Sequence, residues 1–321
     1  MGVRIFVTGA SGFVGSRLVQ VLSARPDVQV TVAVRDPKFS CSDADQVVRF
    51  DDLATADFSA VLTGVDAVVH CAARVHVMND SAADPLEAFR RVNVEGTLAL
   101  AHQAARAGVR RFVFLSSIKV NGEGTASGAP YTADQPPAPS DPYGISKMEA
   151  EHGLLELAAA TGMEVVIIRP VLVYGPGVKA NFLSMMRWLH KGVPLPFGAI
   201  HNARSLVALD NLVDLSITCI SHPAAANQVF MVSDGEDLST TVLLRKMASA
   251  LGKPARLLPV PASLLSTAAI MLGKRSLSQR LCGSLQVDIG KTRTLLGWTP
   301  PLSVDDALKV TASAYMESQN T

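Results

Sequence analysis

The sequence predicts an α/β fold built on a doubly wound parallel sheet, and two features of its pattern support this prediction. Short runs of β-branched residues alternate with longer helical patterns, which is typical of strand–helix–strand units. The runs are almost continuously apolar, as expected for strands that helices cover on both faces. The expected strands are residues 3–7, 28–34, 66–72, 110–117 and 164–170, and the expected helices are residues 13–24 and 85–107.

Length and composition predict two folded domains. The chain has 321 residues, of which 48% are hydrophobic and 18% charged, and this composition forms cores rather than disordered segments. At about 150 residues per domain, the length corresponds to two domains, or to one α/β domain with a large appendage. The alternation becomes irregular after Tyr174-Gly175-Pro176-Gly177. We therefore expect a first domain over residues 1–175 and a smaller α/β substrate domain over residues 176–321, with some C-terminal segments returning to pack on the first.

The charge balance and the cysteine pattern exclude several classes of protein. Lys and Arg number 29 and Asp and Glu 28, so the net charge of +1 provides no overall field to hold a nucleic acid or an anionic membrane. The four cysteines form no CxxC pair and the seven histidines lack ligand spacing, so we predict neither a metal site nor a disulfide framework. The cysteine usage fits a reducing cytoplasm, and the apolar stretch before Gly9 is too short for a signal peptide.

Residues 260–272 form the most apolar stretch late in the chain. They fall short of the roughly 20 residues needed to span a bilayer, so we predict no stable membrane insertion. We interpret them as a packed helix, with peripheral contact to a membrane or a partner as the alternative.

A glycine-rich turn follows the first expected strand. Gly9, Gly12 and Gly15 lie between this strand and the next helix, where glycine allows a tight turn and close approach of a pyrophosphate. The free N–H groups and the dipole of a helix N-terminus favour such an anion. The turn therefore predicts a dinucleotide site.

The end of the second strand bears on the choice of cofactor. An acidic residue there accepts hydrogen bonds from a ribose 2′-hydroxyl, whereas Arg accommodates a 2′-phosphate. Arg35 follows the strand, which favours NADP(H); a register shifted by one residue would place Asp36 there and favour NAD(H). Asp52 and Leu53 follow the third strand and are candidates to clamp the adenine.

Ser117, Tyr143 and Lys147 form the candidate catalytic group. The spacing of Tyr143 and Lys147 places both on one face of a helix. We expect the Lys147 ammonium to lower the pKa of the Tyr143 phenol, so that it can act as acid and base near neutrality. Ser117 ends a buried strand at the carboxyl edge, where ligands of open α/β sheets bind.

Together these motifs resemble the extended short-chain dehydrogenase/reductase family, in its branch of nucleotide-sugar epimerases, dehydratases and reductases. The similarity covers nearly the whole chain. It implies a Rossmann domain, a smaller domain that binds a UDP-sugar, and a homodimer formed by a four-helix contact. Further matching residues are His70-Cys71-Ala72-Ala73, Asn93, Arg169-Pro170, Tyr174-Gly175-Pro176, Arg204 and the closing Leu295-Leu296-Gly297-Trp298-Thr299-Pro300.

The resemblance implies a role for each matching residue. Tyr143 would be the acid and base, Lys147 would hold the nicotinamide ribose, and Ser117 would bond the reacting sugar oxygen. The cofactor contacts would be Gly9, Ser11, Gly12, Phe13, Val14, Gly15, Arg35, Asp52, Leu53, Cys71, Ala72, Ala73, Asn93, Ser116, Tyr143, Lys147, Pro170 and Val171. The substrate contacts would be Arg74, Ser117, Lys119, Asn181, Leu195, Phe197, Arg204 and Arg280.

Two departures from the family pattern narrow the expected reaction. Dehydratases carry Asp-Glu directly after the catalytic hydroxyl residue, whereas this chain has Ile118-Lys119, which argues against 4,6-dehydration. The usual Val-Tyr-Gly is Val120-Asn121-Gly122 here. Residues 116–122 are most similar to bacterial reductases of UDP-4-keto-6-deoxy-N-acetylhexosamines, which serve surface polysaccharide synthesis.

Three functions therefore stand as hypotheses. The first is an NADPH-dependent 4-ketoreductase of such a UDP-sugar, with Lys119 either reaching the substrate or lying solvated in its loop. The second is a UDP-sugar 4-epimerase that retains bound NAD. The third is a non-catalytic NADP-binding sensor on the same fold.

Overall fold

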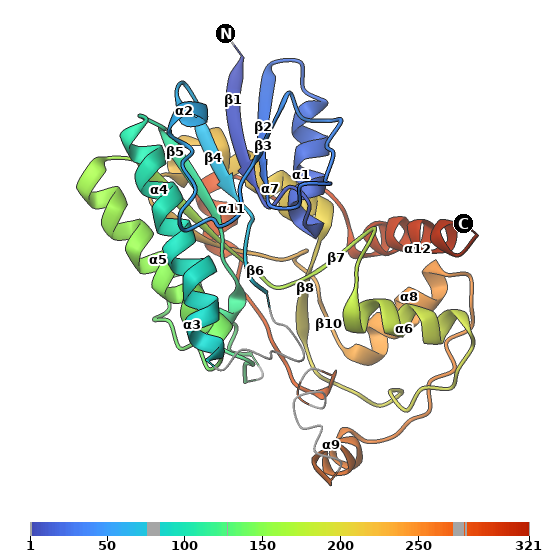
Figure 1. Ribbon diagram of the computed structural model, residues 1–321. Coiled ribbons are helices and arrows are strands. Elements are labelled where there is room, and N and C mark those ends of the chain that lie inside the picture. Colours follow the sequence, from blue (N-terminus) through green and yellow to red (C-terminus); the bar gives the residue numbers. More distant parts are fainter. Residues whose placement is uncertain (1, 76–83, 127, 272–278, 280, 321) are drawn as a thin grey trace.

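The computed structural model describes residues 2–75, 84–126, 128–271, 279 and 281–320. Its centre is a seven-stranded sheet with the strand order β3-β2-β1-β4-β5-β6-β9, and every neighbouring pair is parallel (Figure 1). The five strands expected from the sequence are all present. The strands are β1 (Val3–Thr8), β2 (Val28–Val34), β3 (Gln46–Arg49), β4 (Ala67–His70), β5 (Arg111–Leu115), β6 (Glu164–Pro170) and β9 (Gln228–Val232).

Helices cover both faces of this sheet, which confirms the doubly wound fold. Side chains alternate between the two faces: Ile5 and Val7 of β1 belong to one core cluster, and Phe6 between them belongs to the other. The first cluster lies under α1 (Phe13–Ser23), α7 (Leu209–Ser221) and α11 (Gly290–Leu296). The second lies under α2 (Ser59–Leu62), α4 (Thr97–Arg106) and α5 (Pro142–Thr161).

The helix expected over residues 85–107 is interrupted. It consists of α3 (Pro85–Arg90), the π-helical turn η1 (Arg91–Gly96) and α4. The wider turn contains Asn93, whose buried side chain bonds two other segments. Such contacts between distant segments are absent from a helical sequence pattern, and π-turns of this kind are frequent at functional sites.

The remaining elements form a second layer, which we call the C-terminal lobe. It has its own core and a three-stranded sheet in the order β10-β8-β7. Its strands are β7 (Leu172–Tyr174), β8 (Arg204–Ala208) and β10 (Asp237–Leu238), and its helices are α6 (Ala180–His190), α8 (Thr240–Ala250), α9 (Ala262–Met271) and α12 (Val304–Asn320). Outside this lobe, the short 3₁₀ turn η2 (Ile118–Val120) follows β5, and the short 3₁₀ turn η3 (Pro223–Ala225) follows α7.

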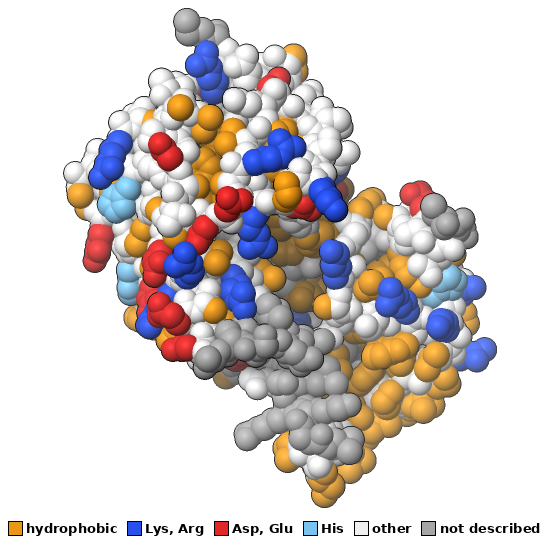
Figure 2. All heavy atoms as spheres, viewed as in Figure 1, with side chains coloured by type: hydrophobic (Ala, Val, Ile, Leu, Met, Phe, Trp, Pro, Cys, Tyr) orange, Lys and Arg blue, Asp and Glu red, His pale blue; other side chains and the backbone are white. Residues whose placement is uncertain are grey.

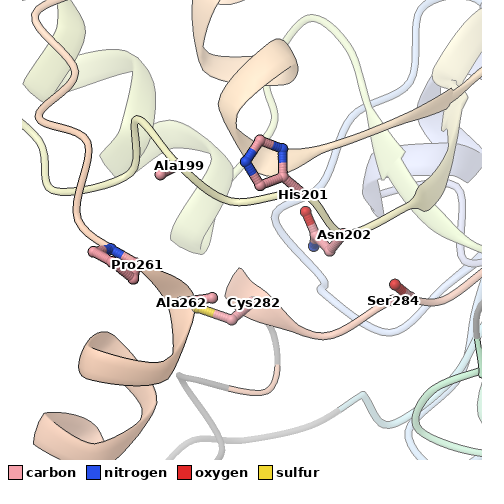
Figure 3. Close-up of a pocket in the computed structure, with 7 residues that line it drawn as sticks. All are labelled: Ala199, His201, Asn202, Pro261, Ala262, Cys282 and Ser284. Atoms are coloured by element: carbon pink, nitrogen blue, oxygen red, sulfur yellow. The ribbon is translucent and has the colours of Figure 1, made fainter.

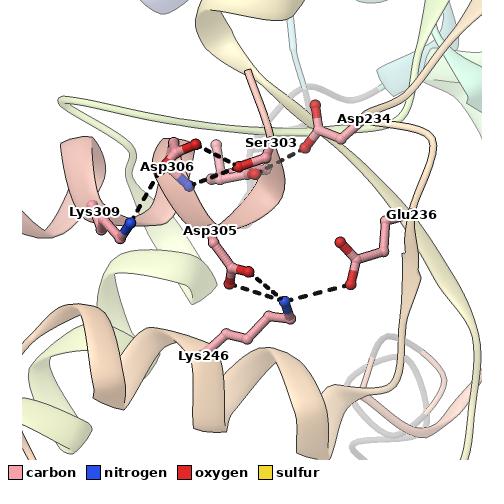
Figure 4. A network of polar contacts seen from close by, with 8 residues as sticks. Asp234, Glu236, Lys246, Ser303, Asp305, Asp306 and Lys309 are labelled. Carbon is pink, nitrogen blue, oxygen red and sulfur yellow. Dashed lines mark hydrogen bonds and ion pairs between the residues drawn. The ribbon is translucent and has the colours of Figure 1, made fainter. Parts of the chain in front are cut away.

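Polar contacts join the lobe to the sheet and hold its helices together. Asp234, just after β9, accepts hydrogen bonds from the Tyr174 hydroxyl at 2.8 Å and from the Asn211 amide at 2.7 Å. Burial raises the pKa of this carboxyl. Farther out, Lys246 of α8 bonds Asp305 of α12 at 2.9 Å (Figure 4). These contacts attach the lobe, with its own core and sheet, to the end of β9, and the division into two domains stays a prediction.

The prediction that residues 260–272 pack as a buried helix is wrong for the part that the structure describes. Residues 262–271 form α9, but no side chain in it is buried, and Leu264 and Met271 are 61% and 82% exposed. The apolar composition predicted burial but could not identify a partner surface. None of the helices in the described ranges is long and apolar enough to cross a membrane.

Candidate active site

The glycine turn lies at the carboxyl end of β1, where the strand order reverses between β2 and β4. Gly9 has a φ of +73°, and a Cβ there would lie 2.6 Å from the amide nitrogen of Ala72. A Cβ on Gly15 would overlap the carbonyl of Gly9. Gly12 begins α1 without a side-chain cap, so N–H groups of the first turn stay available to an anion. Ser11 is exposed in the turn, and Phe13 and Val14 are half-buried against the first core cluster.

The loop after β4 lies beside this turn. The amide of Cys71 donates to the carbonyl of Thr8 at 3.2 Å, and the amide of Ala72 donates to the Thr8 hydroxyl at 3.4 Å. Both residues are partly exposed, as is Ala73. Residues 71–73 therefore form a second wall at the same switch point, where open α/β sheets bind ligands.

The buried His70 side chain links the end of β1 to α4 beneath the glycine turn and residues 71–73. Its Nδ1 lies 2.6 Å from the Thr8 hydroxyl, and its Nε2 lies 2.9 Å from the Thr97 hydroxyl of α4. Burial lowers the pKa of His70 to about 3. The imidazole is therefore neutral at physiological pH, and it serves as a structural hydrogen-bonding group.

Asn93 connects the loop after β4 to α5. Its Oδ1 accepts from the Arg74 amide at 2.8 Å, and its Nδ2 donates to the Arg74 carbonyl and to the Ser146 hydroxyl, each at 3.0 Å. Above it, the Arg74 guanidinium lies 5.6 Å from the centre of the Phe89 ring. The π-helical turn thus positions the backbone that borders the glycine turn.

Tyr143 and Lys147 project from the first turns of α5, which Asp141 caps through the amide of Gly144 at 2.6 Å. The Lys147 ammonium is buried and donates to the carbonyl of Leu115 at 2.8 Å. Burial lowers the pKa of Lys147 to about 8. Ser117, two residues beyond β5, hydrogen-bonds Tyr143. The structure therefore brings the three predicted catalytic residues to one end of β5.

The expected pKa of Tyr143 is wrong for this structure. Burial is the main cause that raises the pKa of Tyr143 to about 12; the hydrogen bond with Ser117 offsets part of this rise, and the nearby Asp141 carboxylate adds a smaller one. Lys147 donates to a backbone carbonyl instead. The phenol is therefore protonated at neutral pH.

A buried ion pair lies behind these residues. Glu151, one turn after Lys147, pairs with Arg169 of β6 at 2.5 Å, and both side chains are almost fully buried. The Ser116 hydroxyl donates to Glu151, and Arg169 donates to Asn121 Oδ1 at 3.0 Å. Ser116, expected at the cofactor, thus directs its side chain into this network. Pro170 and Val171 close β6 next to it.

Sequence reasoning missed Glu151, although a signal was present. Tyr143, Lys147 and Glu151 are spaced by four residues, so they follow one face of α5. When a charged residue lies on the same buried helix face as the catalytic residues, it is expected to pair with a buried group of opposite charge.

Lys119 is half-buried and paired with two carboxylates, and its contact with a substrate stays a prediction. Its ammonium bonds Glu123 and lies 2.7 Å from Asp141, the residue that caps α5. This arrangement links the loop after β5 to the helix that carries Tyr143.

The residues expected at the adenosine end lie in two loops, after β2 and after β3. Arg35 is exposed directly after β2, whereas the Asp36 carboxylate accepts from the Lys38 amide at 2.9 Å. The Asp52 carboxylate accepts from the Ala54 amide at 3.0 Å and pairs with Arg91 at 2.5 Å, and these two contacts, the first the larger, lower its pKa. Leu53 is buried beside Gly96. A role for Asp52 and Leu53 as an adenine clamp stays a prediction.

The predicted substrate contacts of the C-terminal lobe do not all face one cavity. Asn181 is exposed at the start of α6, and Phe197 is half-buried. Leu195 is 5% exposed and packs in the core of the lobe, and its strand-like segment pairs with residues around Leu257. Its place in a base pocket stays a prediction. Arg280 lies outside the described residues.

A hollow of about 560 Å³ opens in this lobe (Figure 3). Arg204 donates to the carbonyl of Gly283 at 3.1 Å, and the neighbours of Gly283 on both sides contribute to the walls. The lining residues are Ala199, His201, Asn202, Pro261, Ala262, Cys282 and Ser284. Within the described residues, no group of three or more His, Cys, Asp or Glu side chains could hold a metal ion.

Comparison with known proteins assigns the family. A family model described as "NAD dependent epimerase/dehydratase family" matches residues 5–233. A protein of Vibrio cholerae described as a UDP-glucose 4-epimerase is 51% identical over 324 residues, covering 100% of this chain and 98% of that protein. The chain belongs to the NAD dependent epimerase/dehydratase family.

Solved structures of similar fold agree with this assignment. MoeE5 in complex with UDP-glucose and NAD has a TM-score of 0.77 at 25% identity, with 98% of this chain and 99% of that chain covered. RMD from Pseudomonas aeruginosa complexed with NADPH has a TM-score of 0.73 at 23% identity, with 97% and 99% covered. The fold therefore occurs with both dinucleotides.

The site residues of this family member fit a dinucleotide. Side chains at positions 9 and 15 would fill the cradle that glycine leaves open between β1, α1 and the loop after β4. The uncapped N-terminus of α1 faces the same end of the sheet. An NAD dependent epimerase/dehydratase thus has room for the pyrophosphate at this turn. The expected NADP(H) preference stays a prediction.

Proposed function

We propose that the protein is a UDP-sugar 4-epimerase that oxidises and re-reduces the sugar at C4. The observation that carries this proposal is the 51% identity, over the whole chain, with the relative described as a UDP-glucose 4-epimerase. The juxtaposition of Ser117, Tyr143 and Lys147 supports it, because 4-epimerisation requires an acid and base next to the cofactor site. An intact catalytic group also argues against the non-catalytic sensor.

The chain's own residues would manage the proton at the sugar O4. Tyr143, protonated by virtue of its raised pKa, is ready to donate to a C4 oxygen. Removing the proton from a C4 hydroxyl requires the phenolate, which positive charge nearby stabilises. Lys147 stands one helical turn away, and Ser117 can hydrogen-bond the same oxygen as Tyr143 does. When bound, the dinucleotide supplies the hydride acceptor and donor.

Turnover without added cofactor tests the proposal. The purified protein should interconvert UDP-glucose and its C4 epimer, or the N-acetylated pair, as followed by NMR. Tyr143→Phe should reduce turnover on the order of a hundredfold to ten-thousandfold and leave dinucleotide binding unchanged. Tyr315→Phe, in the core of the lobe, is the matched control. Full activity of Tyr143→Phe would exclude the assigned role.

A second candidate is the NADPH-dependent reduction of a UDP-4-keto-6-deoxy-N-acetylhexosamine, which one observation favours. Arg35 is exposed at the carboxyl end of β2, and the neighbouring Asp36 carboxylate is engaged by the Lys38 amide. A guanidinium at this position suits a 2′-phosphate. NADPH oxidation that depends on the 4-keto sugar, with no epimerisation of UDP-sugars, would support the reductase over the epimerase.

The homodimer also stays a prediction. Light scattering of the purified protein would measure its mass, and a monomeric mass would contradict it.

A further inference from the structure

Helix α9 is apolar on all sides and yet uncovered. Its ten residues carry no charged side chain, and Thr267 directs its hydroxyl to the helix backbone at Ser263, 3.0 Å away. The more covered side chains are Ala262, Leu265, Ser266 and Ala269. The opposite face, with Leu264, Ala268 and Met271 at helical spacing, is exposed. A helix that is hydrophobic all round is normally buried in protein or in lipid.

The exposed face continues into neighbouring segments of the lobe. Trp188, Val193 and Leu258 are 43%, 40% and 52% exposed. Backbone hydrogen bonds join these segments, since the Leu258 amide donates to the Leu195 carbonyl at 2.8 Å. Figure 2 shows hydrophobic side chains spread over this end of the lobe. We call this surface the apolar patch; it consists of Trp188, Val193, Leu258, Leu264, Ile270 and Met271.

The surroundings of the apolar patch are basic. Residues 165–209 and 238–287, which include all of the patch, contain no Asp or Glu. Lys246 lies within the second of these ranges, but its charge is paired with Asp305 and Glu236, which lie outside both ranges (Figure 4). Four exposed cations lie within five residues of a patch residue in the sequence, and none of them forms an ion pair within the described ranges. We call them the basic rim: Arg187, Lys191, Lys253 and Arg256.

We propose that the apolar patch and the basic rim bind the surface of an anionic lipid bilayer, with α9 lying in the plane of the headgroups. An apolar helix with basic residues around it is the combination that such surfaces bind. A symmetric contact between two copies is disfavoured, because the same patch on both partners would bring one basic rim close to the other. The net charge of +1 does not oppose this binding, because the charge that matters is local.

Such binding would place the hollow of the lobe next to the headgroups. Pro261 and Ala262, at the start of α9, line the hollow, and the α9 residues of the patch follow them directly in the chain (Figure 3). The membrane would therefore adjoin one wall of the hollow without filling the glycine turn or covering Tyr143.

Co-sedimentation of the full-length protein with vesicles tests the proposal. The protein should bind vesicles of phosphatidylcholine with a third phosphatidylglycerol, bind pure phosphatidylcholine much less, and dissociate in high salt. Leu264→Glu should reduce the bound fraction by about tenfold. The matched control is Leu295→Glu, an exposed leucine on α11, which should bind as the wild type does.

Tryptophan fluorescence provides an independent measurement of vesicle binding. Trp188 is exposed at the patch, whereas Trp298 is 5% exposed and donates to Asp214. Vesicle binding should shift the emission to the blue in the wild type and not in Trp188→Phe. Leu264→Glu should turn over a water-soluble UDP-sugar as the wild type does. A loss of vesicle binding can therefore be distinguished from a failure of the proposed reaction.

Two outcomes would overturn the proposal. One is equal binding of the wild type and Leu264→Glu to anionic vesicles. The other is an absence of vesicle binding by the wild type. If the wild type is then a dimer and Leu264→Glu a monomer, α9 is a contact between two copies.

Discussion

Glu151 of α5 and Arg169 of β6 form an ion pair of 2.5 Å that is buried behind Tyr143 and Lys147. Glu151→Gln would leave the guanidinium buried without a counter-charge. We expect the free energy of unfolding to fall by about 3 kcal/mol, because breaking a buried pair leaves an uncompensated charge. Denaturant unfolding measures this change.

A glutamate on the same helix provides the control. Glu156 is exposed on α5, so Glu156→Gln should change the free energy of unfolding by less than about 0.5 kcal/mol. Equal stability of the two variants would show that the buried pair contributes little.

Acid sensitivity should arise in part from His70. The unfolded imidazole takes up a proton near pH 6.5, whereas the folded one, with its pKa lowered to about 3, does so only in strong acid. The unfolded state therefore binds more protons between these values, and stability falls as the pH drops below 6.5. At pH 5 this loss amounts to about 2 kcal/mol.

Unfolding curves at pH 7 and pH 5 would isolate this effect. His70→Gln should lose less stability over this range than the wild type does, whatever its stability at pH 7. His102→Gln, on the exposed side of α4, should follow the wild type. A wild-type acid loss that persists unchanged in His70→Gln would contradict the assignment.

The parts of this molecule that could be predicted from the sequence are those set by local patterns. Apolar runs between helical segments identify the parallel strands, and the spacing of Tyr143 and Lys147 places both on one helix face. Gly9 and Gly15 mark the turn because only glycine fits where two backbones meet.

The remaining features depend on residues far apart in the chain. The π-turn at 91–96 depends on what Asn93 meets in α5 and after β4. The raised pKa of Tyr143 depends on how deeply the fold buries it, which an i, i+4 lysine does not reveal. Likewise, the composition of α9 shows that it is apolar but not whether anything covers it.

Removal of Asn93 should loosen both the fold and the cofactor site. Asn93→Ala would leave the amide and the carbonyl of Arg74 without these partners and would remove the bond to Ser146. We expect a loss of about 2–3 kcal/mol in stability, because buried polar groups lose their hydrogen bonds. Weaker dinucleotide binding should accompany it, since this loop borders Gly9.

The matched comparison is Ser146→Ala, which removes one of these three contacts together with the hydrogen bond from the Ser146 hydroxyl to the Tyr143 carbonyl. It should lose about 1 kcal/mol and retain most of the dinucleotide affinity. Denaturant unfolding and dinucleotide titration of both variants would compare their stabilities and their affinities for the dinucleotide. If Asn93→Ala bound the dinucleotide as the wild type does, the contacts of Asn93 would not support the cofactor site.

Arg35 provides the test of cofactor choice. Arg35→Asp would place a carboxylate at the carboxyl end of β2, where it repels a 2′-phosphate and accepts from a 2′-hydroxyl. The affinity for NADPH relative to NADH should fall by about tenfold or more, because a favourable charge becomes a repulsive one. Arg25→Asp is the matched control, since Arg25 is also exposed but precedes the amino end of β2. If both variants kept the wild-type ratio in titrations, Arg35 would not contact the 2′-position, and the main structural argument for the reductase would be lost.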